Sequence, residues 1–259
     1  MTRGAPATGG EHVALVTGAG RGIGRAIAIR LSRAGMRVAL TARSADELDA
    51  TAALCDGPTL CVPADITAPD APSRIFDEVE ARWGAVDVLI ANAGSGFSAR
   101  VDRTSDADWQ RMLDVNLTAP FRCIRRAVPH MREAGFGRIV VIASNAARIG
   151  EPYIAAYAAS KHGVLGLVRS AAAELASTGV TVNAVCPGYV DTPMTSATVQ
   201  SVVAASGRDA AEVRETLARK QPIGRLISPD EVAEAAWFCV QNGAITGQGL
   251  TLDGGAVQA

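Results

Sequence analysis

Short apolar runs alternate with helical patterns along almost the whole chain, and this alternation restricts the possible folds more than any other feature. The runs are rich in Val, Ile and Ala, as expected of strands that are buried on both faces. They occupy residues 13–17, 36–42, 60–65, 86–92, 138–144, 180–188 and 249–255. Helical crossovers between parallel strands are right-handed. The sequence therefore predicts an α/β fold: a single-domain, Rossmann-type doubly wound parallel sheet of seven strands in the order 3-2-1-4-5-6-7, with helices on both faces.

Capping patterns mark where two of the helices begin. Ser44 and Glu47 have the spacing of a capping box, which predicts a helix from there to about residue 53. Ser228 and Glu231 have the same spacing at the start of the last helix.

Two stretches interrupt the simple alternation. Residues 105–133 carry a long helical pattern that contains Pro120, which predicts one bent helix. Residues 190–226 carry two extra helical patterns between the sixth strand and the last helix. An insertion there would lie over the carboxyl ends of the strands, so we expect a substrate lid. Residues 1–10 are small, polar and rich in Gly and Pro, and they predict a disordered tail before one catalytic domain over residues 11–259.

The composition argues against several classes of function. The net charge is −1, so nothing indicates a nucleic-acid or membrane-surface partner. No apolar stretch reaches the roughly eighteen residues of a membrane span. The five cysteines are scattered and have no Cys-x-x-Cys pair, so neither a disulfide framework nor a metal site is predicted. We expect a reduced, cytoplasmic protein that acts on a small molecule.

Unusual residues gather where the predicted strands end. Ligands of open α/β sheets bind at the carboxyl ends of the strands, so these residues are predicted to share one site. In chain order they are Thr17 and Gly18, Arg43, Asp65, Asn92, Ser144, and Pro187 with Gly188.

The turn after the first strand is rich in glycine and precedes a helix. Its sequence over residues 17–24 is TGAGRGIG, with Gly18, Gly22 and Gly24 spaced to allow a tight turn and a close approach of backbone to a pyrophosphate. Ile23 stands where the common GxGxxG pattern has its third glycine. The position of the turn between a strand and a helix still predicts dinucleotide binding.

The end of the second strand indicates which dinucleotide is bound. An acidic residue there would favour NAD, but residues 41–44 read Thr-Ala-Arg-Ser. Arg43, together with Arg21 in the glycine turn, suits the 2′-phosphate of NADP(H). We therefore expect NADP(H) to be preferred and NAD(H) to remain possible; the alternative is that either guanidinium points to solvent.

Tyr157 and Lys161 lie four residues apart in a helical pattern, so their side chains share one face. An ammonium beside a phenol is predicted to lower the tyrosine pKa and make it a proton donor or acceptor. The alternative is a packed tyrosine beside a solvated lysine. The chain has only two lysines, Lys161 and Lys220, which makes a chance pairing less common.

Taken together, residues 17–24, the triplet Asn92, Ala93 and Gly94, and the set Asn116, Ser144, Tyr157 and Lys161 resemble the short-chain dehydrogenase/reductase family over residues 11–255. The resemblance implies that Tyr157 is the general acid/base and that Lys161 lowers its pKa and holds the nicotinamide ribose. It also implies that Ser144 orients the substrate oxygen and that Asn116 anchors a water in the proton relay.

The same resemblance extends the predicted binding sites. The predicted cofactor contacts are Gly18, Arg21, Gly22, Ile23, Gly24, Arg43, Asp65, Ile66, Asn92, Ala93, Gly94, Tyr157, Lys161, Pro187, Gly188, Val190 and Thr192. The predicted substrate contacts are Ser144, Asn145, Tyr153, Tyr157 and Met194, and for Tyr153 simple packing is an equal alternative. The Ala- and Gly-rich helix of Tyr157 implies a homo-oligomer, a tetramer or a dimer.

Two stretches indicate the substrate class. Residues 174–194 are similar to polyketide ketoreductases and 3-oxoacyl-thioester reductases, and residues 219–255 are similar to 3-hydroxybutyrate dehydrogenases. We expect an NADP(H)-preferring ketoreductase for a 3-oxoacyl or 3-hydroxyacyl substrate, with acyl thioesters among the candidates. The alternatives are an NAD-dependent alcohol or hydroxy-acid dehydrogenase and, more remotely, a non-catalytic dinucleotide-binding regulator.

Overall fold

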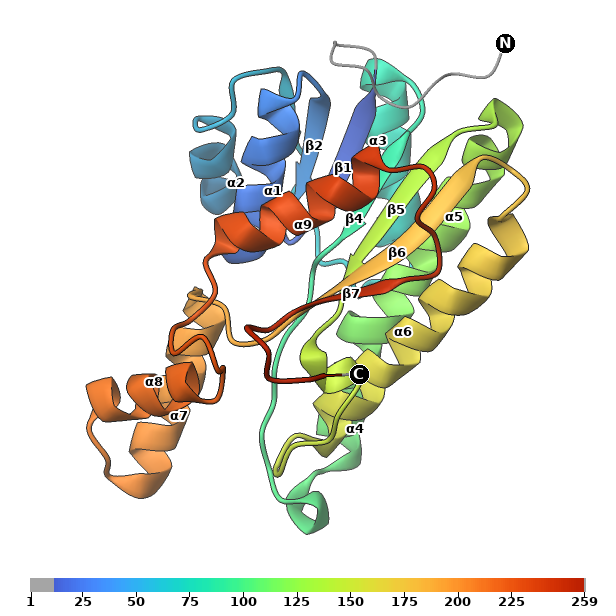
Figure 1. Ribbon diagram of the computed structural model, residues 1–259. Helices are drawn as coiled ribbons and strands as arrows, with labels where there is room; N and C mark the ends of the chain where they lie inside the picture. Colours follow the sequence, from blue (N-terminus) through green and yellow to red (C-terminus); the bar gives the residue numbers. More distant parts are fainter. Residues whose placement is uncertain (1–11, 259) are drawn as a thin grey trace.

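A seven-stranded parallel sheet forms the centre of the computed structural model, which describes residues 12–258 (Figure 1). Its spatial order is β3-β2-β1-β4-β5-β6-β7, which confirms the predicted order. The order reverses between β1 and β4, where a ligand crevice is expected. The predicted tail, residues 1–10, lies outside the described residues. The strands are β1 Val13–Thr17, β2 Arg37–Thr41, β3 Thr59–Cys61, β4 Val88–Ala91, β5 Gly137–Ile142, β6 Val180–Pro187 and β7 Gly249–Leu252.

Helices cover both faces of the sheet, as predicted (Figure 1). Alternate residues of β1 point to opposite faces and enter different cores. Ala14 and Val16 pack with helices α1 and α9, whereas Val13 and Leu15 pack with α3 and α5. The helices on the two faces are α1 Gly22–Arg33, α2 Ala45–Ala52, α3 Ala71–Trp83, α5 Ala119–Ala134, α6 Ala155–Leu175 and α9 Pro229–Gln241.

The helical region predicted over residues 105–133 is present, and it contains a π-helical turn that the sequence did not predict. Helix α4 (Asp106–Leu113) ends in a π-helical turn over Asp114–Thr118, and α5 begins after that turn. The backbone stays helical from α4 through the π turn into α5, and Pro120 lies just after the turn, where its missing N–H removes an α-helical bond to the Asn116 carbonyl oxygen. The π turn places Asn116 in the interior, a use of such turns that is common at functional sites.

One of the two predicted capping boxes is present. Ser228 and Glu231 exchange both hydrogen bonds at the start of α9. At α2, Ser44 accepts from the Glu47 N–H, but the Glu47 carboxylate turns away and bonds Arg21 instead. Because the Arg21 guanidinium binds the Glu47 carboxylate, that carboxylate does not make the second hydrogen bond of the predicted capping box.

The insertion at residues 190–226 contains two helices, as predicted. Helices α7 (Pro193–Ser206) and α8 (Ala210–Arg219) stand apart from the sheet layers at the lower left of Figure 1. They share a small core of Val199, Val213 and Leu217. A parallel bridge between Val190 and Ile227 joins the two ends of the insertion.

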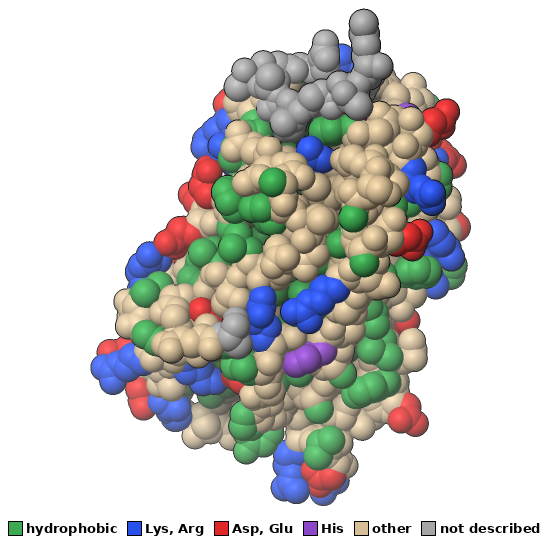
Figure 2. Space-filling view, turned by 45° about the vertical axis from the view of Figure 1, so that its right-hand side comes forward, with side chains coloured by type: hydrophobic (Ala, Val, Ile, Leu, Met, Phe, Trp, Pro, Cys, Tyr) green, Lys and Arg blue, Asp and Glu red, His purple; other side chains and the backbone are tan. Residues whose placement is uncertain are grey.

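The surface drawn in Figure 2 carries basic and acidic side chains that are interspersed, with apolar groups between them. In the described part of the chain, every helix is too short or too polar to cross a bilayer.

Candidate active site

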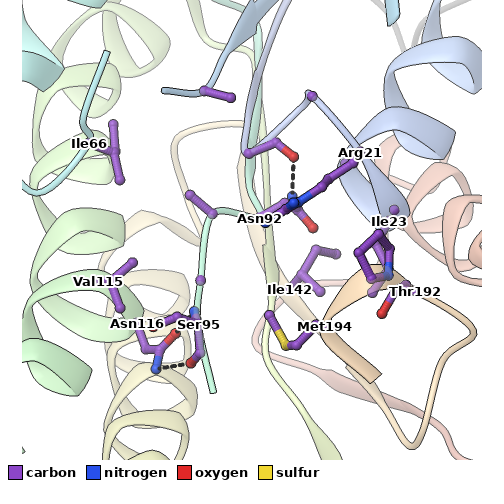
Figure 3. Close-up of a pocket in the computed structure, with 18 of the residues that line it drawn as sticks. Arg21, Ile23, Ile66, Asn92, Ser95, Val115, Asn116, Ile142, Thr192 and Met194 are labelled. Atoms are coloured by element: carbon purple, nitrogen blue, oxygen red, sulfur yellow. Dashed lines mark hydrogen bonds between the residues drawn. The ribbon is translucent and has the colours of Figure 1, made fainter. Parts of the chain in front are cut away.

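A cavity of about 640 Å³ opens at the carboxyl edge of the sheet. Every residue predicted to bind cofactor lines it, and so do all four predicted catalytic residues. Figure 3 shows Val115 and Asn116 facing the cavity from one side, and Ile23, Thr192 and Met194 facing it from the other. The sheet therefore brings together residues that lie more than a hundred positions apart in the sequence.

The glycine turn leaves space that no larger residue would leave. Gly18 has a φ of +67°, and a Cβ there would lie 2.8 Å from Asn92 Nδ2. A Cβ on Gly24 would collide with the carbonyl oxygen of Gly18. The Asn92 amide donates to that same oxygen at 3.2 Å and fixes the turn against the end of β4. Because α1 begins at Gly22, the positive end of its dipole faces the turn, and the cradle fits a dinucleotide pyrophosphate.

Charges of both signs surround the end of β2. Arg21 and Arg43 are exposed, and Arg21 Nη1 donates to Glu47 Oε1 at 3.4 Å. The Asp65 carboxylate accepts from the hydroxyl and the N–H of Thr67, at 2.7 and 2.9 Å. Those two bonds hold the pKa of Asp65 below its usual value, and Arg43 adds to the effect. The rim can thus hold an anionic group through either guanidinium, although Glu47 competes for Arg21.

Two hydroxyl groups meet at the end of β5. Ser144 follows the strand, and its Oγ accepts the Ala146 N–H at 3.1 Å and donates to Asn145 Oδ1 at 3.2 Å. Tyr157 approaches from the first turns of α6. Burial raises the pKa of Tyr157, and a hydrogen bond with Ser144 opposes that increase. The two hydroxyls can therefore both form a hydrogen bond with one substrate oxygen.

The predicted effect of Lys161 on the tyrosine is wrong for this state of the protein. Lys161 is 5% exposed, and its Nζ donates to the carbonyl oxygen of Ile142 at 2.9 Å. It stands 5.7 Å from the centroid of the Tyr157 ring. Burial lowers the pKa of Lys161 to about 8, and the pKa of Tyr157 is raised rather than lowered. Desolvation of the phenol dominates its pKa, and Lys161 is not among the groups that shift it.

Asn116 holds the floor of the cavity through its side chain. Its Nδ2 donates to the Ser95 carbonyl oxygen at 3.0 Å (Figure 3). Nδ2 also donates to Ser160 Oγ at 3.2 Å, and Oδ1 accepts the Ser95 N–H at 3.1 Å. A Cβ on Gly94 would lie 2.9 Å from that Oδ1 and 3.6 Å from Lys161 Nζ. Asn116 therefore joins the loop after β4 to α6 beside the ammonium.

Two predicted substrate contacts do not line the cavity. Asn145 is buried and bonds Ser144, so it acts on the site through its neighbour. Tyr153 is 63% exposed with a φ of +71°, which contradicts packing, and its carbonyl oxygen accepts from Ala99. Met194 does line the cavity, at the start of α7.

Several lining residues were not predicted, and Ser95, Arg111 and Val115 are among them. Arg111 pairs with Asp108 at 2.7 Å, and it precedes Val115 by four residues. An α-helical spacing back from Asn116 would indicate Met112 and Leu113, whereas the cavity takes Arg111, five residues back, across the π turn. Nothing in the local sequence indicates Ser95.

A family model described as short chain dehydrogenase matches residues 12–202. The chain belongs to the short-chain dehydrogenase/reductase family. It is 37% identical to D-beta-hydroxybutyrate dehydrogenase of Rhizobium meliloti (strain 1021) over 250 residues, 93% of this chain and 97% of that one. It is 38% identical to a putative ketoacyl reductase of Streptomyces coelicolor, over 96% of this chain and 98% of that one.

A solved relative supports the same assignment. A variant of actinorhodin polyketide ketoreductase with NADPH superposes with a TM-score of 0.90 at 36% identity, covering 95% of this chain and 97% of that one. This short-chain dehydrogenase/reductase is thus an oxidoreductase of the EC 1.1.1 type, and its family uses NAD(P)(H). Across residues 12–258, no three His, Cys, Asp or Glu side chains are grouped so that they could hold a metal ion.

Proposed function

We propose that this protein is an NADP(H)-preferring ketoreductase that interconverts a ketone and a secondary alcohol on a 3-oxoacyl or 3-hydroxyacyl substrate. The proposal rests on one observation: Ser144, Tyr157 and Lys161 line the same cavity as the glycine turn, at the end of β5. A binding module would need the glycine turn alone, whereas acid–base chemistry needs the phenol.

The proposed chemistry follows from the two hydroxyls. A bound nicotinamide supplies or takes up the hydride. Reduction places negative charge on the carbonyl oxygen, and Ser144 and Tyr157 can both donate a hydrogen bond to that oxygen. The Tyr157 phenol then delivers the proton. Asn116 donates to Ser160, whose hydroxyl donates to the Tyr157 carbonyl oxygen at 2.7 Å, so these contacts support the backbone of the proton donor. Lys161 is anchored to the Ile142 carbonyl oxygen at the end of β5.

The proposed preference for NADP(H) rests on the rim at β2. Arg43 and Arg21 lie there without an acidic residue at the strand end. A guanidinium fork matches phosphate geometry, and an acidic residue would repel a 2′-phosphate. The Arg21–Glu47 pair is the observation that favours the alternative, an NAD-dependent dehydrogenase, because it leaves fewer cations for the phosphate.

The proposed substrate class rests on the lid and on the relatives. The start of α7 presents the apolar side chains of Pro193 and Met194 to the cavity, beside Thr192 and Thr195. An acyl chain suits such a surface. One relative is named as a hydroxybutyrate dehydrogenase and another as a putative ketoacyl reductase, and these names support a substrate with a 3-oxoacyl or 3-hydroxyacyl group.

A substrate screen tests this function directly. Neutral ketones, 3-oxo acids and 3-oxoacyl thioesters would be offered with NADPH and, separately, with NADH, and the loss of nicotinamide absorbance would be followed. We expect turnover with at least one 3-oxoacyl compound and a higher kcat/KM with NADPH. Turnover of none of these compounds with either cofactor would contradict the proposal and favour a regulator.

We further propose that the protein assembles as a homo-oligomer, a tetramer or a dimer. Trp109 on α4 and Phe121 on α5 are 41% and 42% exposed, which is high for large apolar groups. Gly166 in α6 has open space around it, so a second helix could approach closely. Sedimentation at micromolar concentration should show a dimer or tetramer, and a Phe121→Asp variant should dissociate; a monomeric wild-type protein would contradict the proposal.

A further inference from the structure

Three polar side chains form a closed cluster where the lid meets the body of the protein. Lys220 Nζ donates to Glu151 Oε2 at 2.9 Å and to Tyr189 Oη at 3.2 Å, and the Tyr189 hydroxyl donates to Glu151 Oε2 at 3.0 Å. Glu151 belongs to the loop after Ser144, whereas Tyr189 and Lys220 belong to the base of the lid. Each pair in the cluster is hydrogen-bonded.

Tyr189 connects this cluster to the interior of the lid. Its ring packs against the small core of α7 and α8, while its hydroxyl reaches Glu151. Gln221, which is 1% exposed, accepts the Tyr189 N–H at 3.0 Å and donates to the Tyr189 carbonyl oxygen at 3.2 Å. A Cβ on Gly188 would collide with the Gln221 carboxamide, so the backbone here has little room to move. The adjacent residues Lys220 and Gln221 thus fix both the side chain and the backbone of Tyr189.

The cluster also lies close to the catalytic groups. The loop that carries Glu151 begins after Ser144 and ends shortly before Tyr157. Burial is the main cause of the raised pKa of Tyr157, and the Tyr189 and Glu151 side chains add to that effect. On the other side, the lid presents Met194 to the cavity. A change in the cluster can therefore alter the position of both the lid and the loop between Ser144 and Tyr157.

We propose that Glu151, Tyr189 and Lys220 form a latch that positions α7 over the substrate half of the cavity. Lys220 is then a positioning residue for substrate, although it does not line the cavity. The Glu151 side chain is 20% exposed and that of Lys220 is 48% exposed, so water weakens the ion pair and the latch can open and close. The effect on substrate rests on the proposed function, whereas the position of the lid does not.

The experiment compares Lys220→Met, Glu151→Ala and the double variant in the full-length protein. Hydrogen–deuterium exchange of residues 193–206 reports the lid without any substrate. Steady-state kinetics with a neutral ketone and with an anionic 3-oxo acid, each with NADPH, and the Kd of NADPH report the site. Arg208→Met is the matched control, because it breaks the Arg208–Glu212 pair, which lies wholly within the lid.

Each single latch variant should speed amide exchange in α7 and raise the ketone KM by about three- to tenfold, with kcat and the NADPH Kd changed less than about twofold. The double variant should lose less than the sum of the two single variants, because both single changes remove the Lys220–Glu151 contact. Tyr189→Phe should show the same direction of change and serves as a second test if Lys220→Met folds poorly. The control should leave the KM unchanged.

Two results would overturn the latch. One is unchanged α7 exchange in all three single variants. The other is a loss restricted to anionic substrates, which would make Lys220 a substrate ligand instead. If the wild-type protein reduces no ketone at all, the proposed function fails while the exchange measurement still decides whether the latch exists.

Discussion

Lys161 Nζ bonds the carbonyl oxygen of Ile142, and it stands one helical turn from Tyr157, at 5.7 Å from the ring centroid. The ammonium is therefore anchored to the end of β5 and not to the phenol. Burial, opposed by a hydrogen bond with Ser144, raises the pKa of Tyr157. The tyrosine is consequently protonated at neutral pH, which is the form that carbonyl reduction requires.

Opposite pH dependences are expected for the two directions of the reaction. Reduction uses the protonated phenol, so its rate should stay level through neutral pH and fall only on the alkaline side, above the ordinary tyrosine pKa. Oxidation uses the phenolate, so its rate should rise as the pH increases. Initial rates in both directions at saturating cofactor, from about pH 6 to pH 11, test this. An oxidation rate that falls with increasing pH would contradict the role of Tyr157.

Replacing Tyr157 with Phe should remove the proton donor and leave the cavity intact. We expect kcat to fall by about a hundredfold to ten-thousandfold, the usual range for a general acid, while the NADPH Kd changes less than about threefold. Tyr153→Phe is the matched control. Tyr153 is exposed and does not line the cavity, so its variant should keep wild-type turnover. Equal losses in the two variants would argue against a special role for Tyr157.

Lys161→Met should make the free protein more stable at pH 7, although it should be inactive. Burial lowers the folded-state pKa of Lys161 to about 8 from the ordinary 10.5. Below pH 8 the wild-type protein must keep a buried cation, and removing it should add about 1–2 kcal/mol, after the lost hydrogen bond to Ile142 is taken into account.

The pH dependence gives the sign of this effect. Between about pH 8 and pH 10 the unfolded state binds more protons than the folded state, so wild-type stability should rise with pH relative to the variant. Urea unfolding of both proteins at pH 7 and at pH 9.5 measures the difference. An advantage of Lys161→Met that does not shrink at the higher pH would show that the lysine is not the titrating group.

Local patterns made the strand order and the glycine turn predictable. Each strand is an apolar run, and Gly18 and Gly24 lie in the turn and the helix start that come after the first strand. These signals depend on neighbours in the chain, so the sequence contains them in full. The strand-end rule then placed Asn92 and Ser144 in one cavity without any knowledge of side-chain contacts.

Contacts between distant residues were not predictable in the same way. The Ser44–Glu47 spacing indicated a capping box, but the guanidinium of Arg21, 26 residues away, takes the carboxylate. The Tyr157–Lys161 spacing indicated an interaction whose strength depends on burial, which the spacing does not contain.

Arg43→Ala should lower kcat/KM for NADPH by about ten- to a hundredfold and change that for NADH less than about threefold. A lost hydrogen bond to a charged group has this size, and only NADPH carries the 2′-phosphate. Arg21→Ala should have a smaller effect because Glu47 already pairs with Arg21. Glu47→Gln is the complementary variant, and it should improve NADPH use. Equal losses for both cofactors in Arg43→Ala would contradict NADP(H) selection by this residue.

Gly24→Ala should damage the dinucleotide cradle more than any change of similar size elsewhere. The new methyl group would meet the Gly18 carbonyl oxygen and lie 2.5 Å from Asn92 Nδ2, so the turn has to shift. We expect the NADPH Kd to rise at least about tenfold and the free energy of unfolding to fall by about 1–3 kcal/mol, as for an overpacked site.

Gly96→Ala is the control, because a Cβ there meets nothing within 4 Å. Its stability should stay within about 0.5 kcal/mol of wild type. Fluorescence titration with NADPH and urea unfolding would measure both quantities, and a Gly24→Ala protein with unchanged NADPH affinity would show that the cofactor does not use this turn.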